Sequence, residues 1–476
     1  MEFVIDFSGI PSSSPIAFGW WLFIKIGWIF PVIFFILGIL EVWKNQLVTK
    51  YRKTRKYITL AIDVPKNLEI SPLSVENVFN QLAGAQMGVG RFDKWWTGEI
   101  PDSFSFEIVS IGGYIQFLVH CCAQYRDLIE AIIYAQYPDA EIMEVEDYTN
   151  AYKNLKFPNT QYELWGTEIT LDKKEFLPIR TYPEFDHSVE GYRDSMAGLL
   201  EALTRISPGE QAWIQIIVTP AGGDWAENGK TEIKKLIGEK VEKKKDIFDT
   251  IYDIPMSGLG MIADSIGFGA SAEGEKKSAE APNKVPHLTE GEKLVIKSAG
   301  RKISKLGFYT KIRVIYLAEK SLFKSIVPKV IMGGFKQFNT LDMNSFKADS
   351  KTKTGGIVFN KKNRLITRKN KILKRYLNRG HYLEPGTYGK ILNSEELATI
   401  YHFPTLNVKA PMLKRSEAKK AEPPMGLPVE MGGYIRPKNT KPDPTPEISR
   451  ENTAAAVASV STSTPKAEPP SNLPIG

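Results

Sequence analysis

The stretch 104–149 constrains the fold more than any other part of the chain, because its hydrophobic period changes within it. Apolar and polar residues alternate on both sides of Gly112 and Gly113, and this period of two is typical of half-buried strands. Adjacent glycines suit a tight hairpin turn, because its central residues need positive φ. From Ala123 the apolar residues fall at helical spacing, and Pro138 ends that helix before a last strand. The stretch therefore predicts a strand–turn–strand–helix–strand unit.

A strand and a helix precede this unit and complete a larger pattern. The run 57–65 is apolar and strand-like, and Ser71 with Pro72 opens a helix that has one apolar face. Segment 84–101 is predicted to be a loop. The resulting order, strand–helix–strand–strand–helix–strand, is that of a ferredoxin-like βαββαβ domain, which we expect over residues 57–150.

The same order recurs after a connector rich in Tyr and Asn. We expect a second ferredoxin-like domain over 160–348, interrupted by a long insertion at 225–306. Its predicted elements are a strand at 162–171, a helix at 189–206, strands at 212–219 and 309–317, a helix at 322–335 and a weak strand at 341–346. Within the insertion, helices at 227–248 and 290–306 flank a segment, 258–286, whose Gly, Ala, Ser and Lys content predicts flexibility. The predicted fold class is α+β.

Near the N-terminus, residues 18–43 form an apolar run with a single lysine before Glu41. A helix of this length crosses a hydrocarbon core of about 30 Å, so we predict a transmembrane helix. A cleavable signal peptide would need basic residues in front of the run. The preceding residues, 1–17, contain Glu2 and Asp6 but no Lys or Arg, which favours an anchor that is retained.

The orientation of this anchor is predicted from the charges that flank it. Positive charges gather directly after the run, at Lys44, Lys50, Arg52, Lys53, Arg55 and Lys56. Lys and Arg next to a span stay on the cytosolic side of the membrane. We therefore expect the chain to cross the cell (inner, cytoplasmic) membrane once, with residues 1–17 on the outer side and the bulk of the chain in the cytoplasm. The two cysteines, Cys121 and Cys122, are adjacent and cannot form a disulfide framework, which agrees with a reducing compartment.

The charge of the chain is concentrated in one block. Residues 301–379 carry 21 Lys or Arg against three acidic residues, a net charge of +18. The whole chain has a net charge of +8, so the remainder sums to −10. A basic block in an otherwise acidic chain indicates a polyanionic partner.

The densest part of this block is a predicted amphipathic helix without a single acidic residue. Its cations are the candidate binding residues: Lys361, Lys362, Arg364, Arg368, Lys369, Lys371, Lys374, Arg375 and Arg379. Such a helix could neutralise the phosphates of DNA or RNA, anionic lipid headgroups, or the carboxylates of an acidic protein partner. Charge patterning alone leaves these three readings open.

Motifs for catalysis are absent from the sequence. No G-x-x-x-x-G-K-[ST] phosphate loop occurs, no H-E-x-x-H occurs, and the five histidines lack the spacing of metal ligands. A thiolate at Cys121, activated by His120, is the enzymatic alternative. Because both residues lie where a strand ends and a core helix begins, a structural role is favoured. We therefore expect no catalytic, cofactor-binding or metal-binding residue.

The C-terminal part is expected to contain two helices and a tail. Residues 361–408 should hold the basic helix, at 363–378, and a short helix at 394–401 that is capped by the Ser394 side chain. Residues 409–476 are rich in Pro, Ala and Ser, a composition that predicts disorder. The pattern Lys-Ala-Glu-Pro-Pro-x-x-Leu-Pro occurs twice in this tail and suits docking in an aromatic groove.

Two phrases carry a resemblance to a known family. IYAQYPDAEI at 133–142 and NSEELATIYHFP at 393–404, with the Trp-rich anchor, resemble the N-terminal membrane-proximal region of conjugative DNA-transfer proteins related to the type IV secretion coupling ATPases. The resemblance covers most of 20–424. In that family a RecA-like motor with a phosphate loop follows the Glu-Pro-Pro segment, and the residues of that motor are missing from this sequence. The resemblance therefore implies a membrane-anchored subunit without the motor domain.

Two functions are expected from these observations. The leading hypothesis is a membrane-anchored, non-enzymatic scaffold or adaptor of a type IV secretion or conjugation-like assembly. Its expected partners are a separate motor ATPase or other secretion subunits, and the formation of oligomers is left open. The alternative is a membrane-tethered protein that binds nucleic acid, DNA above all, without sequence preference through residues 361–379.

Overall fold

The computed structural model describes ten stretches of the chain. They are residues 20–21, 23–24, 29–65, 70–84, 90–187, 191–192, 194–239, 289–355, 361–380 and 389–404. The N-terminal segment 1–17, the predicted flexible segment 258–286 and the predicted tail 409–476 lie outside the described residues.

A long helix, α2 (Ile29–Thr54), precedes the folded body. Its segment Pro31–Thr54 is the one stretch of the described residues that is long and apolar enough to cross a membrane, by length and composition. The helix extends eleven residues beyond the predicted end of the span at Trp43, because the polar segment that follows contains no Gly or Pro. Val48 in this extension is buried, so the end of α2 packs on the body.

The first half of the body has the predicted element order. The turn between its second and third strands uses positive φ at Gly112 (59°) and Gly113 (91°), which confirms the predicted hairpin. A short helix, α4 (Arg91–Trp96), lies within the segment predicted to be a loop. The other elements are β1 (Tyr57–Asp63), α3 (Leu73–Ala83), β2 (Phe104–Ile111), β3 (Tyr114–Cys122), α5 (Arg126–Gln136) and β4 (Glu141–Val145).

The second half repeats the order with one difference. The predicted helix at 189–206 begins only at Ala197, because the chain before it forms a small hairpin of β6 (Asp186–His187) and β7 (Gly191–Tyr192). The main elements are β5 (Tyr162–Leu171), α6 (Ala197–Thr204), β8 (Glu210–Pro220), β9 (Gly307–Glu319), α11 (Val327–Lys336) and β10 (Phe346–Ala348).

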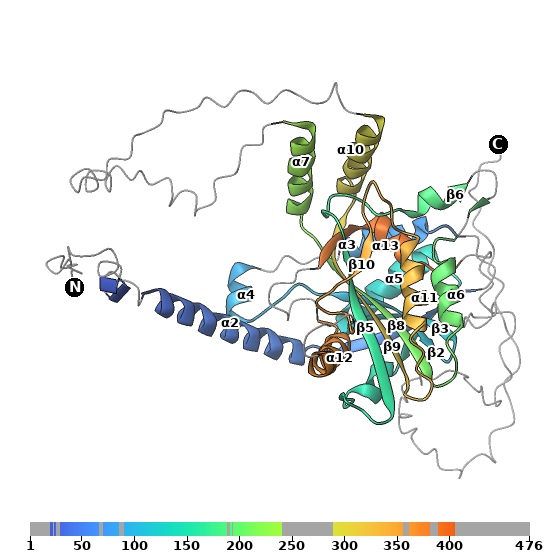
Figure 1. Ribbon diagram of the computed structural model, residues 1–476. Coiled ribbons are helices and arrows are strands. Elements are labelled where there is room, and N and C mark those ends of the chain that lie inside the picture. The colour runs from blue at the N-terminus through green and yellow to red at the C-terminus, as the bar shows by residue number, and fades with distance from the viewer. Residues whose placement is uncertain are drawn as a thin grey trace, which may run out of the picture. The chain divides into compact units, whose positions relative to one another are not determined.

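All these strands except β6 and β7 form one antiparallel sheet in the order β10-β5-β9-β8-β2-β3-β1-β4 (Figure 1). A short strand, β11 (Lys390–Asn393), pairs with β9. The two expected domains share this sheet, because β2 pairs with β8 from Phe104↔Val218 to Ile111↔Gln211. On each side of that junction the strand order, counted within the half, is 4-1-3-2.

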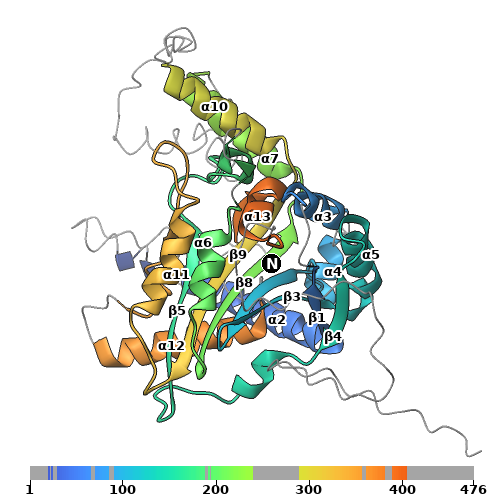
Figure 2. The same ribbon diagram turned by 90° about the vertical axis from the view of Figure 1, so that its right-hand side faces the viewer.

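Helices cover the two faces of the sheet unequally. The larger apolar core lies between the sheet and α3, α5, α6, α11 and α13 (Ser394–Ile400). A smaller core on the opposite face contains Trp213 and Ile315 of the sheet and the apolar side of α12 (Lys361–Asn378). Helices α7 (Asp224–Ile237) and α10 (Glu290–Ile303), both from the insertion, pack on each other beyond the sheet (Figure 2).

The N-terminal cap of α13 differs from the prediction. Asn393, and not Ser394, accepts a hydrogen bond from the backbone N–H of Glu396, at 2.8 Å. The Glu396 carboxylate accepts one from the backbone of Asn393, at 2.9 Å, so the two residues form a capping box. The helix starts where predicted, but the residue that caps it is one position earlier.

A row of buried polar side chains crosses the α12 face of the sheet. Glu107, Gln215, Arg313 and Glu168 are direct partners on the neighbouring strands β2, β8, β9 and β5. Gln215 donates to Glu107 at 2.9 Å and accepts from Arg313 at 3.2 Å, and Arg313 donates to Glu168 at 2.9 Å. We call these four residues the polar row. Buried polar groups must be satisfied, and in this row each one partly satisfies the next.

The C-terminal end of α12 completes the polar row. Arg313 donates to the carbonyl oxygens of Arg375 and Gly380, both at 3.1 Å, and Gln215 donates to that of Tyr376 at 3.2 Å. Carbonyls at a helix C-terminus lack intrahelical donors and carry partial negative charge, so a buried guanidinium stabilises them. The row therefore fixes where α12 ends on the sheet.

Arg379, directly after α12, contacts two carboxylates. It has a left-handed backbone (φ 46°) and places two nitrogens on the Glu107 carboxylate, at 2.7 and 2.9 Å, and a third on Asp147 at 2.6 Å. Burial alone would raise the pKa of Glu107, but the charge and hydrogen bonds of Arg379 lower it below its usual value. The ion pair is thus formed at neutral pH.

This contact predicts a large effect of Glu107→Gln. The substitution leaves the buried Arg379 charge without its main partner, so we expect the free energy of unfolding to fall by about 3 to 5 kcal/mol. Denaturant unfolding of the detergent-solubilised full chain measures it. Glu141→Gln, on the edge strand β4, is the matched control and should change stability by less than about 0.5 kcal/mol. Equal losses in both variants would contradict the role given to Glu107.

Candidate anion-binding site beside helix α12

Helix α12 forms where the sequence predicts it and buries the predicted face. Ile372, Leu373 and Tyr376 are buried against the sheet. Trp213 lies against the Tyr376 ring with a centroid distance of 5.4 Å. Because one side of the helix is apolar and packed, its cations are confined to the remaining surface, and their roles depend on which side of the helix each one occupies.

Three of the nine predicted binding residues are paired with carboxylates. Arg379 is 5 % exposed and is held by Glu107 and Asp147, which removes it from the predicted binding surface. Lys369 forms an ion pair with Glu163 and lies over the Phe157 ring. Arg375 lies 3.4 Å from the Glu168 carboxylate. Sequence reasoning could not separate these three cations from the others, because their partners come from distant strands and turns.

Five of the nine are exposed to solvent. Arg368 is partly exposed, as Lys369 and Arg375 are, and it donates to the carbonyl of Lys353 at 2.8 Å. The exposed residues are Lys361, Lys362, Arg364, Lys371 and Lys374. Lys361, Arg364, Arg368, Lys371 and Arg375 follow each other at spacings of three and four, so they line one side of the helix. We call these five residues the basic stripe.

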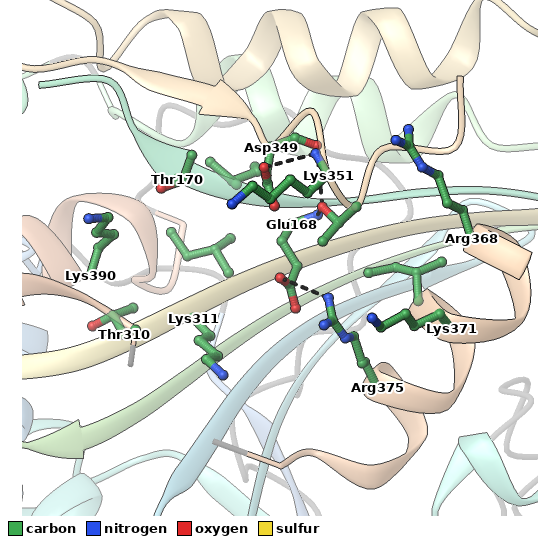
Figure 3. A pocket seen from close by; sticks show the side chains of 15 residues that line it. Glu168, Thr170, Thr310, Lys311, Asp349, Lys351, Arg368, Lys371, Arg375 and Lys390 are labelled. Carbon is green, nitrogen blue, oxygen red and sulfur yellow. Dashed lines mark hydrogen bonds and ion pairs between the residues drawn. The ribbon is translucent and has the colours of Figure 1, made fainter. Parts of the chain in front are cut away.

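A pocket of about 340 Å³ opens between the basic stripe and the sheet (Figure 3). The stripe contributes Arg368, Lys371 and Arg375 to its wall. The opposite wall comes from β5, β9, the turn after β10 and the start of β11, with the polar residues Glu168, Thr170, Thr310, Lys311, Asp349, Lys351, Thr352 and Lys390. This volume is within the range of small-molecule sites.

Positive charge dominates this pocket. Six lysine or arginine side chains line it against two carboxylates. Glu168 is engaged by Arg313 and Arg375, and Asp349 accepts from the backbone N–H of Lys351 at 3.0 Å. Lys390 is paired with Glu175 at 2.8 Å. The pocket still keeps an excess of cations near threonine hydroxyls, and this combination suits a phosphate or another small anion. Because Lys371 is exposed on this wall, its ammonium group is accessible to an incoming anion.

Sequence reasoning missed the half of the pocket that lies outside α12. Lys311 is buried in β9, Lys351 lies in a turn and Lys390 begins β11. Lys311 and Lys351 belong to the block of charge +18 at residues 301–379, so the charge of that block was the sequence signal that could have pointed to them. Only the strand pairing shows that residues almost eighty positions apart line the same cavity.

The thiolate alternative receives no support from the environment of Cys121. Burial raises the pKa of the Cys121 thiol to about 12, so it stays protonated at neutral pH. His120 donates to or accepts from the Thr59 hydroxyl at 2.9 Å and stacks on Tyr57. Burial and the nearby charge of Arg379 lower the pKa of His120 to about 3. Among the described residues, no group of three or more His, Cys, Asp or Glu is arranged to hold a metal ion.

Comparison with known proteins places the chain in a family. A family model described as a domain of unknown function (DUF8128) matches residues 49–415. The chain belongs to this family. The match includes the polar row, α12 and every residue of the pocket, and it begins within the polar end of α2. No curated protein matches the sequence.

The lowered pKa of His120 predicts a loss of stability in acid. An unfolded histidine binds a proton below about pH 6.5, whereas the folded one stays neutral down to about pH 3. The contribution of His120 to stability is therefore fully present above about pH 6.5 and is lost as the pH drops, by roughly 3 kcal/mol at pH 4.5. Denaturant unfolding of the wild type and of His120→Gln, above pH 6.5 and at pH 4.5, measures the contribution of His120. The variant should lose less stability on acidification, and an equal loss would contradict the assignment.

Proposed function

We propose that this protein is a membrane-anchored, non-enzymatic adaptor of a type IV secretion or conjugation-like DNA-transfer assembly. In this proposal α2 crosses the cell membrane once, the N-terminus lies outside, and the folded body lies in the cytosol. The cations that follow the apolar part of α2 support this orientation. The phrases at 133–142 and 393–404, which resemble the conjugative DNA-transfer proteins, support the link to DNA transfer.

One contact carries the adaptor proposal. Arg52, near the end of α2, donates to the carbonyl oxygen of Asn378, the last residue of α12, at 2.8 Å. Arg55, one turn later, lies 3.9 Å from Asp102 and donates to Gln124 at 2.5 Å. The helix α2 thus contacts the basic helix and the segments that flank β2 and β3. Contacts of this kind place the basic helix next to the membrane.

The architecture of the body also suits a docking module. We propose that each half is a ferredoxin-like unit, because each has the element order βαββαβ and the strand order 4-1-3-2. The two units are joined edge to edge through β2 and β8. This pairing covers one edge of each unit and leaves the outer edges to the short strands β4 and β10. The partner we propose for this module is a separate motor ATPase or another secretion subunit.

The adaptor proposal is tested by recruitment to membranes. Proteoliposomes that carry the full chain should bind a purified type IV motor ATPase from the same organism in a flotation assay, whereas empty liposomes should not. Arg52→Ala should lower this binding several-fold, because it releases α12 from the anchor. Lys53→Ala, an exposed neighbour, is the matched control and should leave the binding unchanged. ATP hydrolysis by the chain alone, or recruitment insensitive to Arg52→Ala, would contradict the proposal.

The basic stripe favours a second function, the binding of nucleic acid without sequence preference. Its exposed cations lead along α12 to the pocket, where Lys311, Lys351 and Lys390 add further positive charge. A row of cations that ends in a pocket with hydroxyl groups suits a phosphate backbone, with one phosphate held in the pocket. This binding would let the adaptor hold DNA next to the membrane while a motor acts on it.

The nucleic-acid proposal predicts a specific salt dependence. Binding of the full chain to labelled DNA should weaken steeply with salt, and the slope of log K against log salt should fall by about 3 when three phosphate contacts are removed. The variant Lys361→Glu, Arg364→Glu, Lys371→Glu removes exposed cations of the basic stripe without touching the ion pairs of Lys369, Arg375 or Arg379. Fluorescence anisotropy measures both effects.

A control variant with the same change in net charge distinguishes the effect of losing the basic stripe from the effect of lowering the total charge. Lys329→Glu and Lys336→Glu reverse two exposed lysines of α11, on the opposite face of the sheet, and Lys320→Glu reverses an exposed lysine directly after β9. This control should keep most of its affinity. Equal loss in both triple variants would contradict a site at the basic stripe. Retention of anionic vesicles but not DNA by the basic stripe would instead favour a lipid headgroup as its ligand.

A further inference from the structure

Helix α4 exposes aromatic side chains beside the membrane helix. Phe92 is 70 % exposed and Trp96 is 60 % exposed, although both belong to a folded helix of the body. Their rings contact each other with a centroid distance of 5.8 Å. Two adjacent, exposed aromatic rings on a soluble surface are unfavourable, so this pair calls for an apolar or amphipathic partner.

The anchor supplies the third ring of the same cluster. Trp43 of α2 packs edge to face on Trp96, with a centroid distance of 6.1 Å. Trp43 is the last apolar residue before Lys44 and the polar part of α2. It thus occupies the position at which a membrane helix leaves the hydrocarbon core and where tryptophan is enriched. The aromatic cluster of Trp43, Phe92 and Trp96 is therefore continuous with the apolar surface of the anchor.

The chain that leaves α4 fixes its level along the anchor. Gly98 has positive φ (73°), and a Cβ there would lie 2.4 Å from the backbone of Leu47, so this turn is in tight contact with α2. Tyr51, one turn further along α2, donates to Glu99 at 3.2 Å. From Trp96 to Glu99 the chain thus follows α2 away from the apolar span, over about 12 Å at 1.5 Å per residue. Helix α4 lies at the start of this path, at the level of Trp43.

The side chains further along this path change character in the same direction. Tyr51 and Glu99 are polar, and Arg55 contacts Tyr51 and Asp102. On the other side of Trp43, Val42 and Ile39 expose most of their surface, as a side chain in contact with lipid does. The polarity of the surface therefore changes at Trp43 both on the anchor and on the adjoining segment, which matches the change from hydrocarbon to headgroup and water.

We infer that α4 lies in the headgroup region of the membrane that α2 crosses, with Phe92 and Trp96 inserted at the boundary between headgroups and acyl chains. Aromatic rings prefer this boundary, because their faces are apolar and the indole N–H finds a polar partner there. The contact is a second attachment of the body to the bilayer, some fifty residues from the anchor in sequence. It sets the tilt of the body relative to the membrane, since one helix alone leaves a body free to rotate.

This inference rests on the membrane anchor of the proposed function and not on its DNA or motor partner, so it can fail while the adaptor proposal stands. The test uses the full chain in phospholipid vesicles with a single environment-sensitive fluorophore on an introduced cysteine. Both native cysteines are buried, so labelling is selective for the introduced one. Phe92→Cys places the label on α4, at a side chain exposed enough for the substitution to leave the fold intact.

Two further positions calibrate the depth of the label. Phe35→Cys labels an exposed side chain within the apolar part of α2 and should be quenched most by nitroxides near the ends of the acyl chains. Tyr114→Cys labels the tip of the hairpin between β2 and β3, at a side chain that is 48 % exposed, and should be quenched by aqueous iodide alone. These are the deep and aqueous references.

The label at Phe92→Cys should behave as an interfacial site. Nitroxides near the headgroup should quench it at least threefold more than they quench the label at Tyr114→Cys, and iodide should quench it correspondingly less. Quenching by iodide equal to that at Tyr114→Cys, without quenching by any lipid nitroxide, would overturn the inference. Protection from both iodide and lipid nitroxides would also overturn it, because it would show that a protein surface or a second copy of the chain covers α4.

Discussion

A row of buried polar side chains crosses the centre of the sheet, and its hydrogen-bonding needs are met only when α12 packs on that face. Burial without hydrogen-bond partners would cost free energy for each of its four side chains, Glu107, Gln215, Arg313 and Glu168. Arg313 and Gln215 satisfy the last carbonyls of α12, and Arg379 neutralises Glu107. The same contacts join the two halves of the sheet, because the row runs across the β2–β8 junction. Fold and helix position thus depend on one set of interactions.

This constraint divides the cations of α12 into two groups with different roles. Arg375 and Arg379 form ion pairs with the buried carboxylates Glu168 and Glu107 of the polar row. Lys361, Arg364 and Lys371 face solvent along the basic stripe and retain their charge. Of the nine cations predicted to bind a partner, Lys369, Arg375 and Arg379 are therefore paired within the fold. The excess charge is concentrated at the pocket, where strands from the second half add their own lysines.

Attachment to the membrane depends on the same part of the molecule. The polar end of α2 reaches Asn378 at the end of α12 and the segment after α4, so anchor, basic helix and sheet meet within a small region. In the proposed function this arrangement keeps an anionic partner close to the bilayer. An interfacial position of α4 would add a second point of attachment to the bilayer. Two points of attachment would fix the orientation of the basic stripe relative to the membrane.

The sequence by itself determined the apolar span, the element order of both halves and the basic helix, because each depends on local periodicity and turn chemistry. The glycine hairpin and the limits of β5 are examples. The helix α4 escaped prediction because six residues are too few to show a period, and the cap of α13 moved by one residue because Asn393 competes with Ser394. Only the tertiary structure decided that the two halves share one sheet, that Arg379 is buried and that Lys311, Lys351 and Lys390 meet α12. Those outcomes depend on pairing between segments far apart in the chain, which local pattern does not encode.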